Sequence, residues 1–150
     1  MAKYELFKMR CEKCSYEWEK IAKSTTGDRF VFTSRKKYIP VILMFESIFF
    51  NEVLTLIKKN LQNSTLSKNE MADRFQEMLG QVSDPAPDGT HFSMMADYIC
   101  PKCGSGEVDF GPKNPPEARV EDLPELPHEY WDSLNEKDKK ELVRKHLKNT

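Results

Sequence analysis

The amino-acid sequence predicts an α+β protein in which a small antiparallel β unit is split by a helical insertion and followed by a C-terminal helix. The first observation is the placement of all four cysteines in two CxxC pairs, Cys11 with Cys14 and Cys100 with Cys103. The second is the stretch between the pairs, where apolar residues recur at helical spacing. The chain of 150 residues is long enough for one ordinary domain or for a small core with an appendage.

The cysteine pairs carry the clearest chemistry in the chain. A CxxC turn places two sulfurs within reach of one metal ion, and two such pairs match the four thiolates of a structural zinc site. Around the second pair, Pro101 and Gly104 favour a tight turn, because proline fixes φ and glycine accepts a left-handed conformation. The sequence therefore predicts a zinc ribbon with one structural Zn²⁺ per chain, held by Cys11, Cys14, Cys100 and Cys103.

The two pairs are far apart for a ribbon, since residues 15–99 lie between them. The simplest interpretation is a ribbon that is interrupted by an insertion. Two others stay open: a zinc ion shared between two chains, and two half-sites completed by histidines, of which His91 is the one near a cysteine pair. A catalytic zinc is not expected, because four thiolates leave no open position on the ion.

The split ribbon is predicted over residues 1–23 plus 91–111. Tyr4 and Leu6 precede the first pair, and Tyr16 and Trp18 follow it in alternation with glutamates, which is typical of short strands. We expect residues 91–99 to form a strand that leads into the second pair. Residues 107–110 are expected to complete the ribbon sheet.

The helical insertion is predicted over residues 24–90. It begins with a turn and a strand over 29–33. A long helix is then expected from Val41 to about Gln62, with Pro40 in its first turn and apolar residues around most of its circumference. Ser67 and Glu70 form a capping box that opens a second helix, and Gly80 is expected to end it.

Residues 112–150 are predicted to form a proline-rich linker and a C-terminal helix. Five prolines between positions 111 and 127 indicate an extended connector. Ser133 and Glu136 form another capping box, which is expected to open a helix that runs to about Lys148. Its apolar stripe is narrow, so it needs either this chain's own core or another molecule to be stable.

The charge is close to neutral overall but uneven along the chain. The net charge is −1, while residues 1–40 carry ten lysines and arginines against five acidic residues. A local basic face is therefore expected on the N-terminal part. The residues that would contact nucleic-acid phosphates are Lys20, Lys23, Arg29, Arg35, Lys36 and Lys37. The alternative interpretation of the cluster at 35–37 is a solvated loop.

Several classes of protein do not fit the sequence. The first ten residues are mixed and charged, without the apolar core of a secretory signal, so the cysteines are expected in a reducing, cytoplasmic compartment. The apolar stretch 41–57 contains Glu46, Asn51 and Glu52 and is not expected to span a membrane. No GxSxG, HExxH or glycine-rich phosphate loop occurs, so neither an enzymatic activity nor a small-molecule substrate is expected.

Residues 4–19, which contain the first cysteine pair preceded by Arg10 and followed by aromatic residues and glutamates, resemble the opening of FmdB-type regulatory zinc ribbons. Residues 100–105 resemble the second knuckle of the same ribbon class. The resemblance covers about 30 residues in all and implies a zinc-binding β ribbon in a regulatory protein. Two features depart from the family pattern: Ser15 stands where the family usually has glycine, and the pairs are much further apart.

Taken together, these patterns predict a non-enzymatic zinc-binding regulatory or adaptor protein that contacts nucleic acid or the transcription machinery. The alternative is a protein-interaction or inhibitor module, in dimeric form, that acts through the apolar insertion helix and the C-terminal helix without nucleic acid. In either case a protein partner or self-association is expected. Loss of affinity with rising salt would distinguish the first class from the second.

Overall fold

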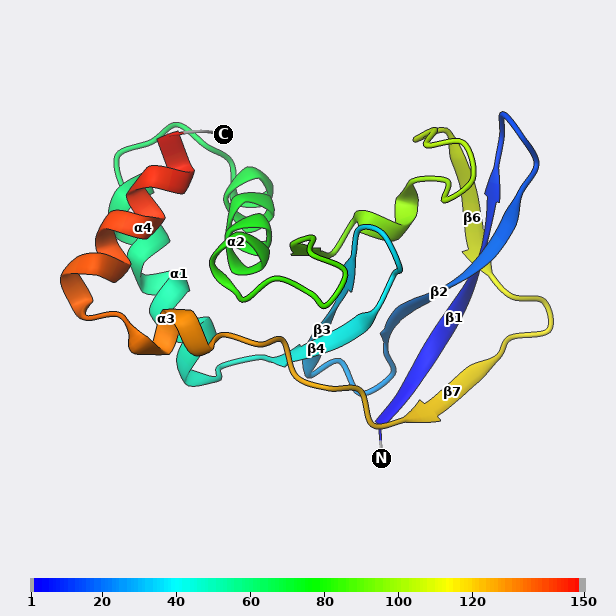
Figure 1. Cartoon of the computed structure of the whole chain (residues 1–150), viewed down its shortest axis with the longest axis horizontal. Coiled ribbons are helices and arrows are strands. Elements are labelled where there is room, and N and C mark those ends of the chain that lie inside the picture. The colour runs from blue at the N-terminus through cyan, green and yellow to red at the C-terminus, as the bar shows by residue number, and fades with distance from the viewer. Residues whose placement is uncertain (1, 149–150) are drawn as a thin grey trace.

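The computed structural model describes residues 2–148, in which two antiparallel sheets combine with four α-helices and one 3₁₀ helix. Figure 1 shows three parts along the long axis of the molecule. The α-helices lie at one end, the sheet that contains β1 lies at the other end, and β3 and β4 lie between them. The α+β class expected from the sequence is confirmed.

The first sheet is built around β1 (Ala2–Cys11). Along one edge of β1 lies β2 (Glu17–Ser24). The other edge is shared: β6 (Val108–Pro112) pairs with the Cys11 end, and β7 (Ala118–Glu121) pairs with the Ala2 end. The strands expected on both sides of the first cysteine pair and after the second are confirmed. The connector expected after residue 111 is extended, but it is not only a linker, because a proline-free stretch within it forms β7 and joins the first sheet.

The second sheet has the order β4-β3-β5, with β3 (Arg29–Ser34), β4 (Pro40–Met44) and β5 (Phe92–Ser93). Alternate residues of β4 enter two different hydrophobic clusters. Val41 and Leu43 pack with the helices, whereas Ile42 packs with Tyr4 and Leu6 of the first sheet. The hairpin of β3 and β4 is therefore covered on both faces, which explains its almost continuous run of apolar residues.

The long helix expected over residues 41–62 is wrong in its first third. The chain forms β4 to Met44, turns at Glu46 with a positive φ of 61°, and begins α1 (Ile48–Leu61) after Ser47. Ser47 caps the helix, since its hydroxyl accepts a hydrogen bond from the N–H of Phe50 at 3.3 Å. Pro40, expected in the first helical turn, is instead the first residue of a strand.

The capping box at Ser67 and Glu70 is confirmed at the start of α2 (Lys68–Val82). Gly80 does not end this helix. A Cβ at position 80 would lie 2.1 Å from the carbonyl oxygen of Phe92, so glycine is required there for close packing of α2 on β5. The strand expected over 91–99 is also shorter than predicted: after β5 the chain forms a 3₁₀ helix, η1 (Ala96–Tyr98).

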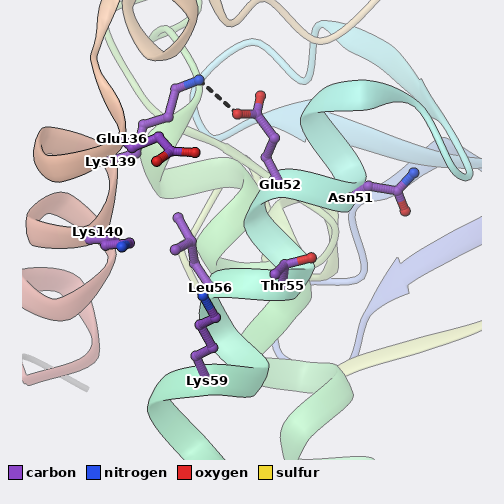
Figure 2. Close-up of a pocket in the computed structure, with 8 residues that line it drawn as sticks. All are labelled: Asn51, Glu52, Thr55, Leu56, Lys59, Glu136, Lys139 and Lys140. Atoms are coloured by element: carbon purple, nitrogen blue, oxygen red, sulfur yellow. Dashed lines mark hydrogen bonds and ion pairs between the residues drawn. The ribbon is translucent and has the colours of Figure 1, made fainter.

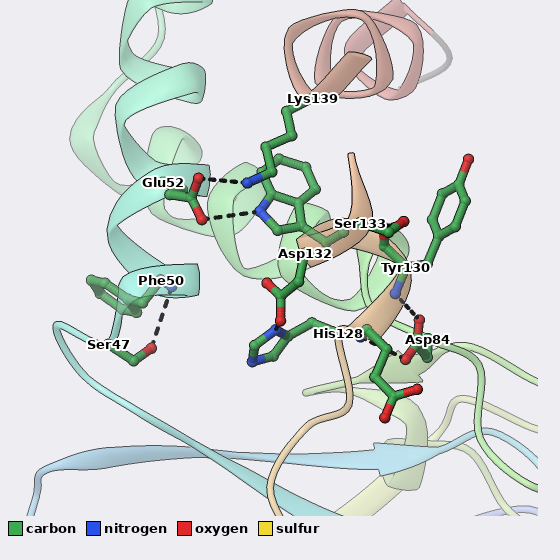
Figure 3. A network of polar contacts seen from close by, with 11 residues as sticks. Ser47, Phe50, Glu52, Asp84, His128, Tyr130, Asp132, Ser133 and Lys139 are labelled. Carbon is green, nitrogen blue, oxygen red and sulfur yellow. Dashed lines mark hydrogen bonds and ion pairs between the residues drawn. The ribbon is translucent and has the colours of Figure 1, made fainter. Parts of the chain in front are cut away.

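The C-terminal helices are α3 (Glu129–Ser133) and α4 (Glu136–Lys148). The expected capping box at Ser133 is wrong, because the side chain of Asn135 caps α4 by accepting from the N–H of Asp138 at 2.9 Å. Figure 3 shows how α3 is anchored: both carboxylate oxygens of Asp84 accept backbone N–H groups of its first turn, from Glu129 at 2.8 Å and Tyr130 at 3.1 Å.

The C-terminal segment contributes to the main core. Trp131 and Val143 are fully buried together with Phe49, Val53 and Ile57 of α1. Glu52 of α1 accepts hydrogen bonds from the Trp131 indole N–H and from Lys139 (Figure 3). The narrow apolar stripe of α4 is thus covered by this chain's own core. Most of the apolar surface of α1 is covered in the same way, although Ile48 in its first turn is 82% exposed. Self-association through this helix stays a prediction.

No helix within residues 2–148 has both the length and the apolar character that crossing a membrane requires.

Candidate metal centre

The first cysteine pair lies in the turn that joins β1 to β2. Cys11 is the last residue of β1, and its N–H donates to the carbonyl of Tyr16 at 2.9 Å. The N–H of Ser15 donates back to the carbonyl of Cys11 at 2.9 Å, which closes the turn around the pair. Ser15 adopts a positive φ of 65°, a conformation that favours glycine.

The second pair repeats this geometry between η1 and β6. The N–H of Cys100 donates to the carbonyl of Ser105 at 2.9 Å, and the N–H of Gly104 donates to the carbonyl of Cys100 at 2.9 Å. Gly104 has a φ of 76°, so it occupies the position that corresponds to Ser15. The two turns are therefore equivalent knuckles, although only the second has the glycine that this backbone conformation prefers.

The structure brings both knuckles together within one chain. The sulfurs of Cys11 and Cys103 are 3.5 Å apart, those of Cys14 and Cys100 are 3.6 Å apart, and all four lie within 4.8 Å of one another. Pairing of β1 with β6 produces this meeting, because it places Cys11 opposite Val108. Within residues 2–148, these four cysteines are the only group of three or more potential metal-ligating side chains. No histidine belongs to this group.

The four thiols differ in exposure and in acidity. Cys11 and Cys100 are buried, Cys14 is half-buried and Cys103 is exposed. Backbone N–H groups of Cys14 and Lys13 lower the pKa of the Cys11 thiol to about 7. The N–H of Ser105 favours the thiolate of Cys103, but the hydrogen bonds with the other three cysteines and partial desolvation together outweigh it and raise the pKa of Cys103 to about 12.

A buried ion pair positions the approach to the second knuckle. Lys20 of β2 lies 2.6 Å from the carboxylate of Asp97 in η1, and the two side chains are 5% and 2% exposed. The Lys20 ammonium also lies 4.9 Å from the centre of the Tyr98 ring. Burial raises the pKa of Asp97, and the Lys20 charge opposes this shift. Trp18 adds a hydrogen bond from its indole N–H to the Asp97 carbonyl at 3.0 Å.

Sequence reasoning missed this support because its two halves are far apart in the chain. Lys20 and Asp97 are separated by 77 positions. One local feature of the sequence could have indicated a buried partner for Lys20. Trp18 and Lys20 occupy alternate positions on β2 and hence point to the same face. A lysine on the same face as a tryptophan needs a partner if that face is covered.

The six basic residues proposed for phosphate contact do not form one surface. Lys20 is excluded from such contact by its burial beside Asp97. Arg29 is held by Asp28 through two hydrogen bonds, at 2.9 and 3.1 Å, and Lys23 lies 3.8 Å from Glu5. The structure does bring together the other three in the turn between β3 and β4, where Arg35, Lys36 and Lys37 are all exposed.

This basic turn is fixed beside the second knuckle. The N–H groups of Arg35 and Lys37 donate to Thr90 and Asp88, at 2.9 and 3.0 Å. Tyr38, which follows the turn, donates a hydrogen bond from its hydroxyl to the carbonyl of Ile99, the residue before Cys100. This hydrogen bond links the end of the basic turn to the loop that carries Cys100 and Cys103.

The chain matches no protein-family model, and comparisons with curated proteins and with solved structures found no similar protein. The resemblance to FmdB-type ribbons consequently rests on residues 4–19 and 100–105 alone. What the geometry establishes is a four-cysteine cluster that is suited to binding a metal ion.

Proposed function

We propose that the four-cysteine cluster holds one structural zinc ion per chain in a split zinc ribbon. The observation that carries the proposal is the separation of the sulfurs across the two knuckles, 3.5 and 3.6 Å. A tetrahedral zinc ion with Zn–S bonds of about 2.3 Å needs sulfurs roughly 3.8 Å apart. The cysteines of one chain therefore fit the ion with a small outward movement, and no second chain has to contribute a ligand.

The role of such an ion is structural rather than catalytic. Four thiolates complete its coordination and leave no position for water or substrate. The ion would join the β1–β2 turn to the segment between η1 and β6, and it would add to the pairing of β1 with β6 that already holds them together. We accordingly propose a non-enzymatic protein, and a reducing compartment such as the cytoplasm suits its four free thiols.

The test is the zinc content of the purified protein measured together with its native mass. One zinc per chain, in a protein that is monomeric under native conditions, is expected. A zinc-to-chain ratio of one half, or a dimer that dissociates when the metal is removed, would assign the site to an interface between chains and would contradict the proposal.

We further propose that the protein is a regulatory or adaptor protein that contacts nucleic acid through the basic turn between β3 and β4. Support comes from the grouping of Arg35, Lys36 and Lys37 in one exposed turn beside the proposed zinc site. Three unpaired cations on a rigid loop suit phosphate contact. The protein-interaction alternative has less support, because most of the apolar residues of α1 and α4 on which it relied pack within the chain, while Ile48 of α1 is exposed.

Binding of fluorescent single-stranded and duplex oligonucleotides tests this second proposal. Changing Arg35, Lys36 and Lys37 to glutamine should weaken binding and reduce the slope of log affinity against log salt by about 0.7–0.9 for each phosphate contact that is lost. Lys23→Gln is a matched control, because this exposed lysine is already next to Glu5. Equal binding by the triple variant and the unmodified protein would contradict the proposal.

A further inference from the structure

A groove between α1 and α4 lies at the end of the molecule opposite to the cysteine cluster (Figure 1). Its deeper part has a volume of about 320 Å³ and is lined by α1 residues between Asn51 and Lys59 and by the first two turns of α4. A wider hollow of about 730 Å³ continues from it and shares Leu56, Lys59, Glu136 and Lys140. Volumes of this size are typical of sites for small ligands or for parts of larger ones.

Two kinds of lysine line the deeper part. Lys139 is committed to the fold: it lies 2.7 Å from the carboxylate of Glu52, is 14% exposed and stands 5.5 Å from the centre of the Trp131 ring. Lys59 and Lys140 have no acidic group within ion-pair distance among residues 2–148. Figure 2 shows Lys140 reaching from α4 toward Leu56 and Lys59 extending along α1 toward the same residue. Two unpaired lysine side chains therefore approach Leu56, the one apolar residue that lines this part of the groove.

The charge of the groove is opposite in sign to the charge of the chain. Five basic side chains line its two parts, against three acidic ones, Glu52, Glu136 and Glu141. Glu52 is paired with Lys139, and Glu141 is paired with Arg144. Glu136 is then the one acidic side chain of the groove without an ion pair, against Lys59, Lys137 and Lys140. A net positive potential remains in a concave site, where field lines are focused.

We propose that the groove between α1 and α4 binds a phosphate-bearing ligand, with Lys59 and Lys140 contacting the phosphate from its two walls. Lysine is a point charge that contacts phosphate oxygens from any direction, so two unpaired lysines on facing walls can contact different oxygens of one phosphate group. The one arginine of the groove, Arg144, is already engaged by Glu141. The continuation of the groove toward Lys137 and Arg144 suits a ligand with more than one phosphate.

Two sources share this chemistry: a free polyphosphate compound and the backbone of a nucleic acid. Inorganic triphosphate and a single-stranded oligonucleotide, each titrated into ¹⁵N-labelled protein, distinguish them. With either probe, saturable shifts are expected in the amide signals of Thr55, Leu56 and Lys140. Binding of triphosphate identifies a free ligand, and binding of the oligonucleotide alone identifies a backbone.

The double variant Lys59→Gln/Lys140→Gln should weaken the binding of whichever probe binds by roughly tenfold for each lysine removed. The matched control is Lys58→Gln/Lys68→Gln, which removes two exposed lysines outside the groove and should leave affinity within about threefold, the effect of general screening. Thermal unfolding of both variants verifies that they are folded. The absence of saturable shifts with both probes, or equal losses in the two double variants, would overturn the inference.

The groove test is independent of the proposals for the cysteine cluster and the basic turn. The groove variants change no residue of the knuckles or of the turn at 35–37. If an oligonucleotide loses affinity with the turn variant alone and triphosphate does not bind, the nucleic-acid proposal stands and the groove inference fails. If the oligonucleotide loses affinity with the groove variant alone, the groove inference stands and the proposal for the basic turn fails.

Discussion

Lys20 and Asp97 form an ion pair of 2.6 Å in the interior of the protein and thereby join β2 to the segment that leads into the second cysteine knuckle. Both side chains have lost almost all contact with water. Such a pair contributes little net stability compared with apolar residues of the same volume, but removal of one partner leaves a buried charge uncompensated. A single substitution in this pair should therefore disturb the loop that carries Cys100 and Cys103, although neither Lys20 nor Asp97 is a candidate ligand.

We predict that Asp97→Asn lowers the free energy of unfolding by about 3–5 kcal/mol, because it leaves the Lys20 charge buried and unpaired. Lys20→Met should have a comparable effect through Asp97. The double variant Lys20→Met/Asp97→Asn should lose less than the sum of the two single changes. Urea unfolding measures all three. Lys23→Met, which removes an exposed lysine beside Glu5, serves as control and should change stability by less than about 1 kcal/mol.

Loss of one cysteine should act through metal binding and not through packing. Cys103→Ser changes an exposed residue, yet we expect it to lower the thermal midpoint by at least about 10 °C, because metal-binding free energy is folding free energy in closed thiolate sites. In an excess of chelator the unmodified protein and the variant should unfold at nearly the same temperature. A difference that persists without metal would show that the serine acts on the fold directly.

The two knuckles offer a reciprocal pair of substitutions. Ser15 and Gly104 occupy equivalent positions with φ of 65° and 76°. We predict that Ser15→Gly raises the free energy of unfolding by about 0.5–1 kcal/mol and that Gly104→Ser lowers it by a similar amount, because only glycine adopts this conformation without strain. A Cβ at position 104 meets no atom within 4 Å, so the loss is conformational. Chemical denaturation measures both variants, and changes of the same sign would contradict the equivalence of the knuckles.

Gly80→Ala should destabilise the protein although alanine is the better helix former. The added methyl group would lie 2.1 Å from the carbonyl oxygen of Phe92, which belongs to the backbone of β5 and has little freedom to move. We expect a loss of about 1–3 kcal/mol from overpacking, measured by urea unfolding. Gly106→Ala is the control, since open space surrounds that position and the change should be nearly neutral. A neutral result at position 80 would show that α2 can move away from β5.

Stability at acidic pH should depend in part on Asp28. The hydrogen bond from Arg29, followed by that from Thr26, holds the pKa of this carboxyl well below its usual range in the folded state. Stability from this group is therefore present above the ordinary aspartate pKa and is lost as pH falls through it, from about pH 4 downward. We predict that Asp28→Asn has a shallower loss of stability below pH 5 than the unmodified protein. Parallel slopes in urea unfolding at a series of pH values would contradict this assignment.

The cysteine cluster could be predicted from the sequence because a CxxC knuckle is a local structure, with its turn residues adjacent to its ligands. The error over residues 41–62 has a different origin. β4 is buried on both faces, so Val41, Ile42 and Leu43 are all apolar, and a short apolar run does not distinguish a strand from a buried helix. The boundary at Ser47 carried a capping residue, but the positive φ of Glu46 leaves no trace in the sequence.

The role of the C-terminal segment could not be predicted because its partners are distant. Asp84 caps α3 across 45 positions, and Glu52 meets Lys139 across 87. Prolines near positions 115 and 124 indicate an extended chain correctly, yet an extended chain becomes a strand wherever a partner edge is available. β1 supplies that edge to residues 118–121. Composition predicts local conformation here, while the pairing is decided by tertiary contacts.

Because β1 lies in the middle of its sheet, the partners of one of its edges, β6 and β7, are synthesised long after it. Cys11 leaves the ribosome 92 residues before Cys103, which at about 5–20 residues per second is an interval of roughly 5–20 s. Throughout it, one edge of β1 has no partner and two thiols wait for the other two. Until Cys103 emerges, about two thirds of the way along the chain, a newly made chain is exposed to mispairing with its neighbours and to oxidation, and the four thiols could not yet bind one metal ion together.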